Sequence, residues 1–347
     1  MKLENLMNAM WYKNKARPLF YALLMPALAF EAFVYLRRWF YRFFYPHRRF
    51  PVPIIVIGNL TPGGTGKTPF TLALVKLLQE KGYHLGVVAR GYKSKAELAK
   101  HPVLINDTHT AADVGDEAYM LYHKTKVPCA INRKRVAAVA TLLKAHPNLD
   151  LILSDDGLQH LKLKRDMEIV IIDGERRFGN GATLPAGPLR EPITRLSSVD
   201  FALTSGLDFT IEVKGLHPLT GKKGTLNFPS SLAEEGRVKG HAVAGIGHPE
   251  RFFEALKSLG HTVIPHTFPD HHAFTMKDFA GFENEPIIMT EKDAVKCQNF
   301  PLANAFYLQI EAVLTPVFQD DFLKLVTEWY RTAFKKNKAH FCSVKGE

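Results

Sequence analysis

The stretch PVPIIVIGNLTPGGTGKTPFTLALVKLLQEKG, residues 51–82, decides the fold. It begins with an apolar, β-branched run typical of a buried strand, which leads directly into TPGGTGKT at residues 61–68. Pro69 then stands where a first-turn helix residue belongs, and a helical apolar period continues to Gly82. A strand, a glycine-rich loop and a helix in this order predict a phosphate-binding loop.

The loop carries the residue types that nucleotide phosphates require. Gly63, Gly64 and Gly66 allow the backbone to curl so that successive amide groups point at phosphate. Lys67 adds positive charge for the terminal phosphates, and the Thr68 hydroxyl can bind Mg²⁺. We therefore predict ATP and Mg²⁺ as cofactors. The predicted nucleotide-binding residues are Thr61, Pro62, Gly63, Gly64, Thr65, Gly66, Lys67 and Thr68.

Two positions distinguish this loop from others. Phosphate loops usually begin with a glycine where this chain has Thr61, but the GKT core, the strand and the helix are all present. A family of membrane-recruited dimeric ATPases carries a lysine before GGxGKT, and this chain has Pro62 there. Pro62 therefore argues against such an ATPase, which is the main alternative from another functional class.

Two acidic residues follow another apolar strand. DLILSDD, residues 150–156, is typical of a strand that delivers Asp155 and Asp156 at its carboxyl end, where open α/β sheets gather their ligands. We predict that one of the two binds Mg²⁺ together with Thr68, without deciding which. Paired acids after a strand are also common turn formers, so the residues alone leave both interpretations open.

Further apolar runs extend the pattern and predict an α/β fold. Strands are predicted within 84–92, 127–131, 168–173 and 200–205, with a helix at 133–146. The second half repeats the theme, with a strand and helix in 236–260, strands in 261–268 and 305–314, a strand and a polar turn in 286–296, and a terminal helix near 318–334. Residues 217–228 resemble a hairpin or loop. With 347 residues and 46% hydrophobic content, two lobes are expected.

Charge and cysteine content narrow the functional classes. The net charge of +11 favours nucleic acid, an anionic membrane surface or a polyanionic substrate. The chain shows no recognisable nucleic-acid-binding motif, so a nucleic-acid partner is not expected. Its three cysteines, Cys129, Cys297 and Cys342, lie far apart without CxxC spacing and indicate neither a disulfide framework nor a zinc ribbon.

The N-terminal segment has the composition of a membrane anchor. Residues 18–36 are apolar and roughly long enough to cross a bilayer, but Pro26 and Glu31 interrupt them. Basic residues stand on both sides, and aromatic and basic residues alternate through 37–49. Rings at the headgroup boundary and guanidinium groups on lipid phosphates suit a segment lying in an anionic interface. Whether it spans the membrane or lies in it is left open.

Two other interpretations of this segment are weighed. Ala27-Leu28-Ala29 matches the small-x-small pattern of a secretory cleavage site, but cleavage there would send an ATP-binding loop to a compartment without ATP. A helix that merely packs on the protein's own core is the other alternative, which the dense mixture of aromatic and basic residues disfavours.

Arginines gather in the glycine- and proline-rich stretch after residue 173. Arg176, Arg177, Arg190 and Arg195 suggest contacts to an acidic ligand, with an ordinary surface connection as the equal alternative. Arg90 and Tyr92 end the strand predicted within 84–92. The residues alone do not decide whether these side chains bind a substrate.

The chain as a whole resembles a known family, the tetraacyldisaccharide 4'-kinases of Gram-negative bacteria. The motifs GNLTPGGTGKTP, ARGY, VGDEA, SDDGLQH, IIDGERRFGNG, LPAGPLREP, FPDHHAF and TEKDAVK are similar to family motifs and occur in the family's order, over roughly residues 1–300. The resemblance implies transfer of the γ-phosphate of ATP to the 4'-hydroxyl of tetraacyldisaccharide 1-phosphate, an acidic glycolipid, in lipid A biosynthesis. The absence of the usual first glycine, at Thr61, is also typical of this family.

The resemblance also implies roles for single residues. Asp116 in VGDEA would be the base that accepts the proton of the sugar hydroxyl, although the residues alone favour a helix cap. His271 in FPDHHAF, preceded by Asp270, would orient that base. The spacing of the histidines in this region matches no known metal-ligand pattern, so a metal site is not predicted there. Lys292 in TEKDAVK stays unassigned, because a solvated lysine and a contact to a nucleotide or an acid are both open. The predicted substrate residues are Arg90, Tyr92, Arg133, Gln159, Arg190 and Glu191.

From these observations we predict an α/β architecture with a P-loop NTPase-type lobe, an N-terminal membrane-associated helix and a smaller α/β lobe joined by a β-stranded linker. The predicted divisions are an interfacial membrane anchor at 1–50, the nucleotide-binding lobe at 51–207, the β linker at 208–240 and the second lobe at 241–347. Attachment to the cytoplasmic face of the inner membrane is expected, and no obligate protein partner is evident.

Overall fold

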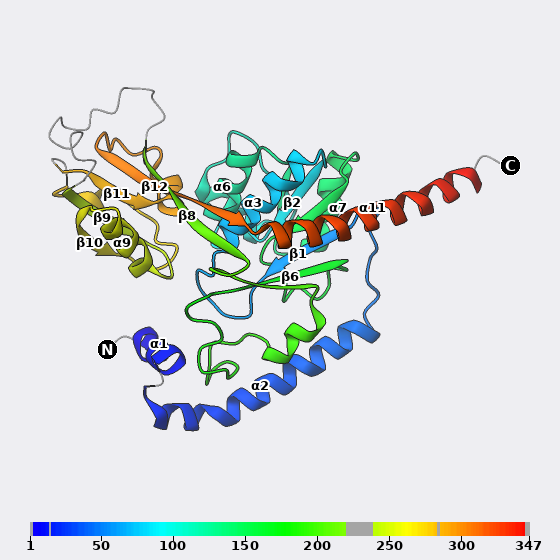
Figure 1. The fold of residues 1–347 in the computed structure, drawn as a ribbon, viewed down its shortest axis with the longest axis horizontal. Coiled ribbons are helices and arrows are strands. Elements are labelled where there is room, and N and C mark those ends of the chain that lie inside the picture. Colours follow the sequence, from blue (N-terminus) through cyan, green and yellow to red (C-terminus); the bar gives the residue numbers. More distant parts are fainter. Residues whose placement is uncertain (1–2, 14, 220–238, 283–284, 344–347) are drawn as a thin grey trace.

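Two sheets of mainly parallel strands, each accompanied by helices, form two lobes that a β ribbon joins (Figure 1). The computed structural model describes residues 3–13, 15–219, 239–282 and 285–343. Most of the hairpin or loop predicted at 217–228, and much of the linker predicted at 208–240, lie outside these residues. The predicted fold class, a P-loop lobe with a smaller α/β lobe, is confirmed, while the division into domains stays a prediction.

The larger lobe is built on a seven-stranded sheet in the order β3-β4-β2-β5-β1-β6-β7, in which β3 is antiparallel to β4 and the other pairs are parallel. Its strands are β1 (Ile54–Gly58), β2 (Leu85–Ala89), β3 (Val103–Leu104), β4 (Cys129–Ile131), β5 (Leu151–Ser154), β6 (Met167–Ile172) and β7 (Phe201–Thr204). Its helices are α3 (Lys67–Glu80), α4 (Lys95–Leu98), α5 (Ala111–Val114), α6 (Asp116–Thr125), α7 (Arg135–Ala145) and the 3-10 helix η1 (Ile193–Ser198).

The parallel strands bring the sequence motifs to one edge of this sheet. β1, β2 and β5 are neighbours and run in the same direction, so their carboxyl ends lie side by side. The loop at 61–68 follows β1, Arg90 follows β2, and Asp155 follows β5. Every residue of these three strands is buried, which explains why the sequence shows continuous apolar runs there.

The smaller lobe has a five-stranded sheet in the order β10-β9-β11-β12-β8. Its elements are β8 (Phe209–Pro218), β9 (Lys239–Ala244), α9 (Pro249–Ser258), β10 (Thr262–Thr267), the 3-10 helix η2 (Met276–Phe279), β11 (Ile287–Thr290), α10 (Glu291–Cys297) and β12 (Ala305–Leu314). The polar turn predicted after Thr290 is wrong, because the chain forms α10 there. The Thr290 side chain caps this short helix by accepting a hydrogen bond from the Asp293 amide.

The two longest strands connect the lobes. β8 and β12 pair in antiparallel register from Phe209 opposite Leu314 to Pro218 opposite Phe306. At one end Phe209 is fully buried in the larger lobe, with its ring 5.2 Å from that of Phe70. At the other end β12 continues the smaller sheet by pairing with β11. The ribbon therefore belongs to both cores.

The last helix returns to the larger lobe although it follows the smaller one in sequence. α11 (Pro316–Ser343) leaves the ribbon and extends along the larger lobe (Figure 1). Its Phe318 ring lies 5.6 Å from Phe70 and 5.3 Å from Phe201, and Phe322 is fully buried in the same cluster. Helical periodicity predicts such a helix but does not tell which surface it covers.

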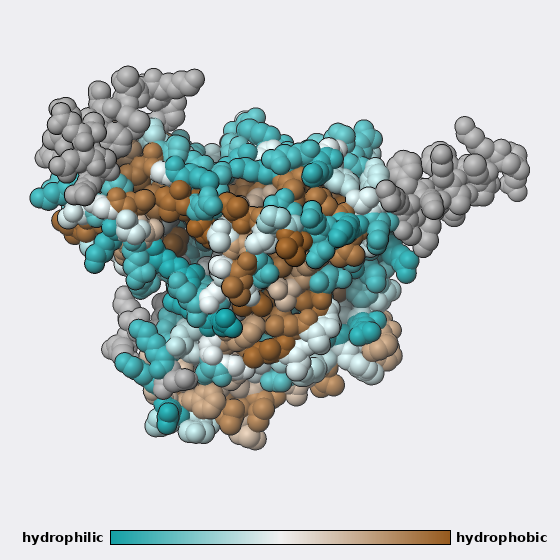
Figure 2. Space-filling view, viewed as in Figure 1, coloured by the Kyte–Doolittle hydropathy of each residue, from teal (hydrophilic) through white to brown (hydrophobic). Residues whose placement is uncertain are grey.

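The N-terminal segment forms two helices, α1 (Leu3–Lys13) and α2 (Arg17–Phe43). α2 continues through Pro26 and lies along the edge of the larger lobe (Figure 1). This helix is long and apolar enough to cross a membrane, although length and composition alone do not show that it does so. In the same view, apolar side chains gather along this edge (Figure 2). The exposed large apolar residues of α2 and its end are Tyr21, Met25, Leu28, Phe33, Tyr35, Leu36, Trp39, Phe40, Phe43 and Phe44.

We expect Phe322→Ala to lower the free energy of unfolding by about 3–5 kcal/mol, because it leaves a cavity in a fully buried aromatic cluster. Chemical denaturation followed by circular dichroism measures this loss. Val317→Ala is the matched control, since this side chain on the same helix is 72% exposed and its truncation should change stability by less than about 0.5 kcal/mol. Equal losses in the two variants would contradict the docking of α11.

Candidate active site

An open cleft of about 1740 Å³ lies where the two lobes face each other, above the carboxyl edge of the larger sheet. The loop residues 62–68 form its floor, and β8, β12 and the loops after β9 and β10 contribute to its other walls. Thr61 is buried behind the loop and does not line the cleft. The other predicted nucleotide-binding residues do line it.

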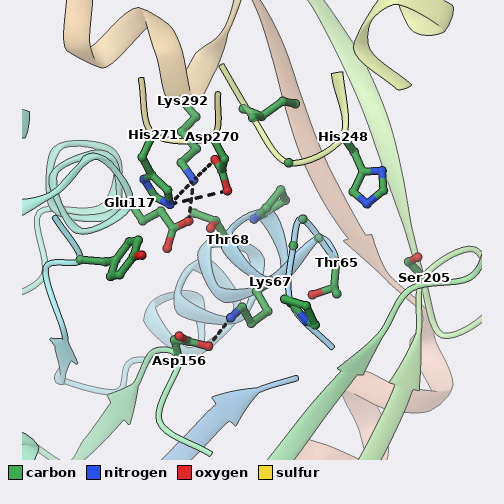
Figure 3. Close-up of a pocket in the computed structure, with 18 of the residues that line it drawn as sticks. Thr65, Lys67, Thr68, Glu117, Asp156, Ser205, His248, Asp270, His271 and Lys292 are labelled. Carbon is green, nitrogen blue, oxygen red and sulfur yellow. Dashed lines mark hydrogen bonds and ion pairs between the residues drawn. The ribbon is translucent and has the colours of Figure 1, made fainter. Parts of the chain in front are cut away.

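The backbone of the loop has the shape that its glycines permit. Gly63 and Gly66 have φ angles of 103° and 83°, in the left-handed region that favours glycine. Lys67 begins α3, and its ammonium donates to Asn59 Oδ1 at 3.3 Å and forms a close ion pair with Asp156 (Figure 3). The loop therefore presents its lysine at the cleft, with a carboxylate as its partner.

The two acids after β5 lie in different surroundings. Asp156 reaches the cleft, and although burial opposes its ionisation, the charges of Lys67 and Arg190 outweigh burial and lower its pKa to about 2. The Asp155 side chain is 4% exposed and accepts a hydrogen bond of 3.4 Å from Thr71 Oγ1. Burial and the charge of Glu117 raise the pKa of Asp155 to about 6. The structure thus holds one paired and one poorly compensated carboxylate at the carboxyl end of β5.

Asp116 and His271 are in contact across the two lobes. Asp116 begins α6 in the larger lobe, directly after Gly115, whose φ of 92° turns the chain. His271 lies in the loop after β10, and its Nδ1 is 3.0 Å and 3.3 Å from the two carboxylate oxygens of Asp116. The ring of Tyr92 meets the imidazole edge-on at 5.1 Å. The pairing that the family resemblance implies is thus present in the geometry, while the role of each residue stays a prediction.

The Asp116 carboxylate is held in its ionised form. Burial by itself would raise its pKa, because the side chain is almost fully enclosed. The hydrogen bond from His271 and the positive charge of Lys292 outweigh burial and bring the pKa below the ordinary value of 3.8. A proton acceptor is therefore available here at neutral pH.

Lys292 joins this pair from α10. Its ammonium lies 2.9 Å from Glu117 Oε1, 3.6 Å from Asp270 Oδ1 and 3.3 Å from His271 Nε2 (Figure 3). Lys292 therefore contacts acids and is not a freely solvated lysine. Sequence alone could not decide between these two interpretations, because the residues that Lys292 contacts are distant in the chain. A capping threonine before an acidic residue at 290–293 was the only local sign that a helix presents this lysine.

The predicted substrate residues divide into two groups. Five of them line the cleft: Arg90, Tyr92, Arg133, Gln159 and Arg190. Glu191 does not line it, because its side chain is 3% exposed and forms an ion pair of 3.2 Å with Arg195. Its other oxygen accepts a hydrogen bond of 2.9 Å from Gln159 Nε2. Glu191 therefore braces Gln159 from behind.

The four arginines after residue 173 also divide into two that line the cleft and two that do not. Arg177 and Arg190 line the cleft, whereas Arg195 is buried between Glu168 and Glu191. The guanidinium of Arg176 stacks over the Tyr12 ring of α1 at 4.6 Å. Two of these four residues are thus structural partners within the described chain.

Further ion pairs hold the lobes together around the cleft. Arg251 of α9 binds Asp173 at the end of β6 through two hydrogen bonds of 2.6 and 2.8 Å, and it also contacts Glu175. Lys124 of α6 pairs with Glu291 of α10 at 2.5 Å. The lobes are therefore in contact on both sides of the loop at 61–68.

The chain is similar to one protein family and to named relatives over most of its length. The family model described as tetraacyldisaccharide-1-P 4'-kinase matches residues 20–327. Tetraacyldisaccharide 4'-kinase of Nitrosococcus oceani is 42% identical over 324 residues, covering 92% of this chain and 93% of that protein. The enzyme of the same name from Ruthia magnifica is 43% identical over 315 residues, covering 88% and 95%.

A solved structure is also similar. The crystal structure of LpxK from Aquifex aeolicus in complex with ATP matches with a TM-score of 0.72 and 26% identity, covering 90% of this chain and 99% of that one. The family model, the relatives and this structure all span most of the chain. The chain therefore belongs to the tetraacyldisaccharide-1-P 4'-kinase family.

Proposed function

We propose that this protein transfers the γ-phosphate of ATP to the 4'-hydroxyl of tetraacyldisaccharide 1-phosphate, with Mg²⁺ as cofactor, at an anionic membrane surface. The observation that carries the proposal is the contact between Asp116 and His271. His271 lines the same cleft as the phosphate-binding loop, and Asp116 lines a smaller pocket together with His271, Asp155 and Asp156. Membership of the kinase family supplies the reaction. The roles of the individual residues are our proposal.

The phosphate-binding loop is ready to exchange a carboxylate for a nucleotide. Lys67 is paired with Asp156, so phosphate oxygens entering the loop would take over the ammonium as charge-assisted acceptors. Glycine amides and the N-terminus of α3, which begins at Lys67, favour the same anionic groups. We propose that residues 62–68 hold the ATP phosphates.

The acids beside the loop fit a magnesium ion. Thr68 offers a hydroxyl, and Asp155 and Asp156 offer carboxylates, the hard oxygen ligands that Mg²⁺ prefers. The raised pKa of Asp155, caused by burial and by Glu117, marks a site where a divalent cation would compensate negative charge. When bound, Mg²⁺ would neutralise charge on the β- and γ-phosphates. We propose Thr68 and these two acids as its ligands.

Asp116 is the proposed base for the sugar hydroxyl. An alcohol attacks phosphorus readily only if its proton is taken up as the new bond forms. The ionised carboxylate of Asp116 can accept that proton, while His271 holds its orientation through the 3.0 Å hydrogen bond. Arg90, Arg133 and Arg190 line the cleft and suit the acidic groups of the glycolipid.

The N-terminal helix suits an acceptor that resides in a membrane. α2 exposes aromatic and aliphatic side chains along most of its length and contributes only Ala27 and Val34 as buried residues. Its arginines also contact the larger lobe, with Arg37 donating to the Gln159 carbonyl at 3.1 Å. We propose that α2 attaches the protein to the cytoplasmic face of the inner membrane, with the cleft within reach of lipid substrate.

The first test is transfer of labelled γ-phosphate from ATP to tetraacyldisaccharide 1-phosphate in detergent micelles with Mg²⁺. We expect labelled lipid, with the label on the 4'-position. ATP hydrolysis without labelled lipid would contradict the kinase function and favour a regulatory ATPase.

Asp116→Asn should lower kcat by about 10²–10⁴-fold, because the amide keeps the shape of the side chain but cannot accept the proton. The KM for ATP should change less than about twofold, since Asp116 contacts no residue of the phosphate-binding loop among the described interactions. The pKa of wild-type Asp116 lies below 3.8, so the carboxylate stays ionised and competent on acidification to about pH 5. Full activity of the variant would show that Asp116 is not the base. The alternative role of helix cap, which the residues alone favoured, is wrong, because Gly115 is the cap and Asp116 is the first residue of α6.

Replacing Trp39 and Phe40 by Glu should weaken binding to vesicles of anionic phospholipid by roughly tenfold or more, because both exposed rings are lost and negative charge is added. Vesicle flotation measures the bound fraction, and added salt should weaken binding further. Leu98→Glu is the control, since this exposed side chain lies on α4, in the larger lobe and outside α2. Equal binding by all variants would argue against attachment through α2.

A further inference from the structure

Lys292 is a half-buried cation at the junction of the two lobes, and the reaction described above does not use it. Its side chain is 19% exposed. Its three nearest acceptors come from different parts of the chain: Glu117 from α6 of the larger lobe, and Asp270 and His271 from the loop after β10. Within the described residues, this ammonium is therefore the direct link between the acidic start of α6 and the imidazole that contacts Asp116.

The chemistry of these contacts fixes the direction of each hydrogen bond. Burial alone would lower the pKa of Lys292, but the charges of Glu117, Asp116 and Asp270 outweigh it and raise the pKa above the ordinary lysine value. Lys292 is thus an ammonium, which has three N–H donors and no acceptor. Its contact with His271 Nε2 at 3.3 Å therefore requires an unprotonated Nε2 that accepts.

The remaining ring nitrogen must then carry the proton. Nδ1 of His271 lies 3.0 Å and 3.3 Å from the carboxylate oxygens of Asp116, so a proton on Nδ1 is donated to that carboxylate. A proton on Nε2 would instead point at the ammonium, and the Nδ1 lone pair would face the carboxylate. The backbone supports the arrangement, because His271 has a φ of 60° and its amide donates to the Gly245 carbonyl at 3.2 Å.

We propose that Lys292 is a positioning residue for phosphoryl transfer, which keeps the His271 imidazole neutral with its single proton on Nδ1 and directed at Asp116. The inference rests on the proposed function of the Asp116–His271 pair and deepens it. A neutral donor orients the carboxylate without forming an ion pair with it, so it reduces the basicity of Asp116 toward the substrate hydroxyl less than an imidazolium at the same distance would.

The surrounding charges explain why the imidazole needs such a neighbour. Asp116 and Glu117 face it from α6, Asp270 precedes it in its own loop with Oδ2 3.8 Å from Nε2, and Tyr92 packs on it from the end of β2. Lys292 supplies the cation that contacts the ring, and Lys296 of the same helix pairs with Asp293 instead. Without Lys292, Nε2 would have no cation in contact, and a proton on that nitrogen would find the Asp270 carboxylate as its acceptor.

A simpler interpretation is that Lys292 only ties α6 to α10 through its ion pair with Glu117. The chain offers a matched control, because Lys124 on α6 and Glu291 on α10 form another ion pair, of 2.5 Å, between the same two helices. Lys292→Met and Lys124→Met each remove one such pair, but only Lys292 contacts His271. Lys292→Arg keeps the cation and serves as the conservative variant.

The direct experiment is ¹⁵N nuclear magnetic resonance of the full chain with labelled histidine, in which His271→Gln identifies the signals of His271. It needs neither ATP nor lipid, so it remains readable if the kinase assay fails. We expect a single proton on Nδ1 in the wild type and in Lys124→Met at neutral pH, and protons on both nitrogens in Lys292→Met. A wild-type proton on Nε2, or a Lys292→Met spectrum identical to the wild type, would overturn the proposal.

Kinetics give the second measurement. At about pH 6.5, Lys292→Met should lower kcat by roughly 10–100-fold with less than a twofold change in the KM for ATP, and the deficit should shrink as pH rises and the second proton leaves the ring. Lys292→Arg should recover most of the activity. A deficit that is the same at every pH, or one matched by Lys124→Met, would assign Lys292 a purely structural role.

Discussion

The junction of the two lobes is the contact on which the rest of the active site depends. The larger lobe supplies Asp116 and Glu117 at the start of α6, and the smaller lobe supplies His271 and Lys292. The Asp116 carboxylate is buried and would be costly without a partner, so the lobes stabilise each other where it meets His271. The ribbon of β8 and β12, anchored in both cores, holds the two sides at the distance that this contact needs.

Local patterns predicted most of the fold because most of it is decided locally. Continuous apolar runs identified β1, β2 and β5, whose side chains are buried on both faces of a parallel sheet. The helix α10 was missed because seven residues hold too little periodicity, and its start depends on the Thr290 cap. The docking of α11 on the larger lobe is decided by Phe318 and Phe322 meeting Phe70, a contact that no periodicity reveals.

In the candidate site, too, features set by one short segment could be predicted, and features set by residues distant in sequence could not. The loop at 61–68 and the acids after β5 could be predicted because each role follows from one strand and the residues that end it. The geometry of Asp116 became an expectation only through family resemblance, since its partner lies 155 positions away. Lys292 and Glu117 are 175 positions apart, and Glu191 is separated from the cleft by its own partners. Such pairings have no signature in either segment alone.

One network of polar contacts links α2 to the cleft. Arg38 of α2 lies 3.8 Å from Glu191, which in turn accepts a hydrogen bond from Gln159 at the cleft wall. Gln159 also donates to the Asn59 carbonyl at the entrance to the phosphate-binding loop. Two of the arginines that the sequence assigns to lipid phosphates therefore contact the protein itself, since Arg37 donates to the Gln159 carbonyl and Arg38 lies beside Glu191. These contacts fix α2 to the larger lobe on the side of the helix that faces the protein.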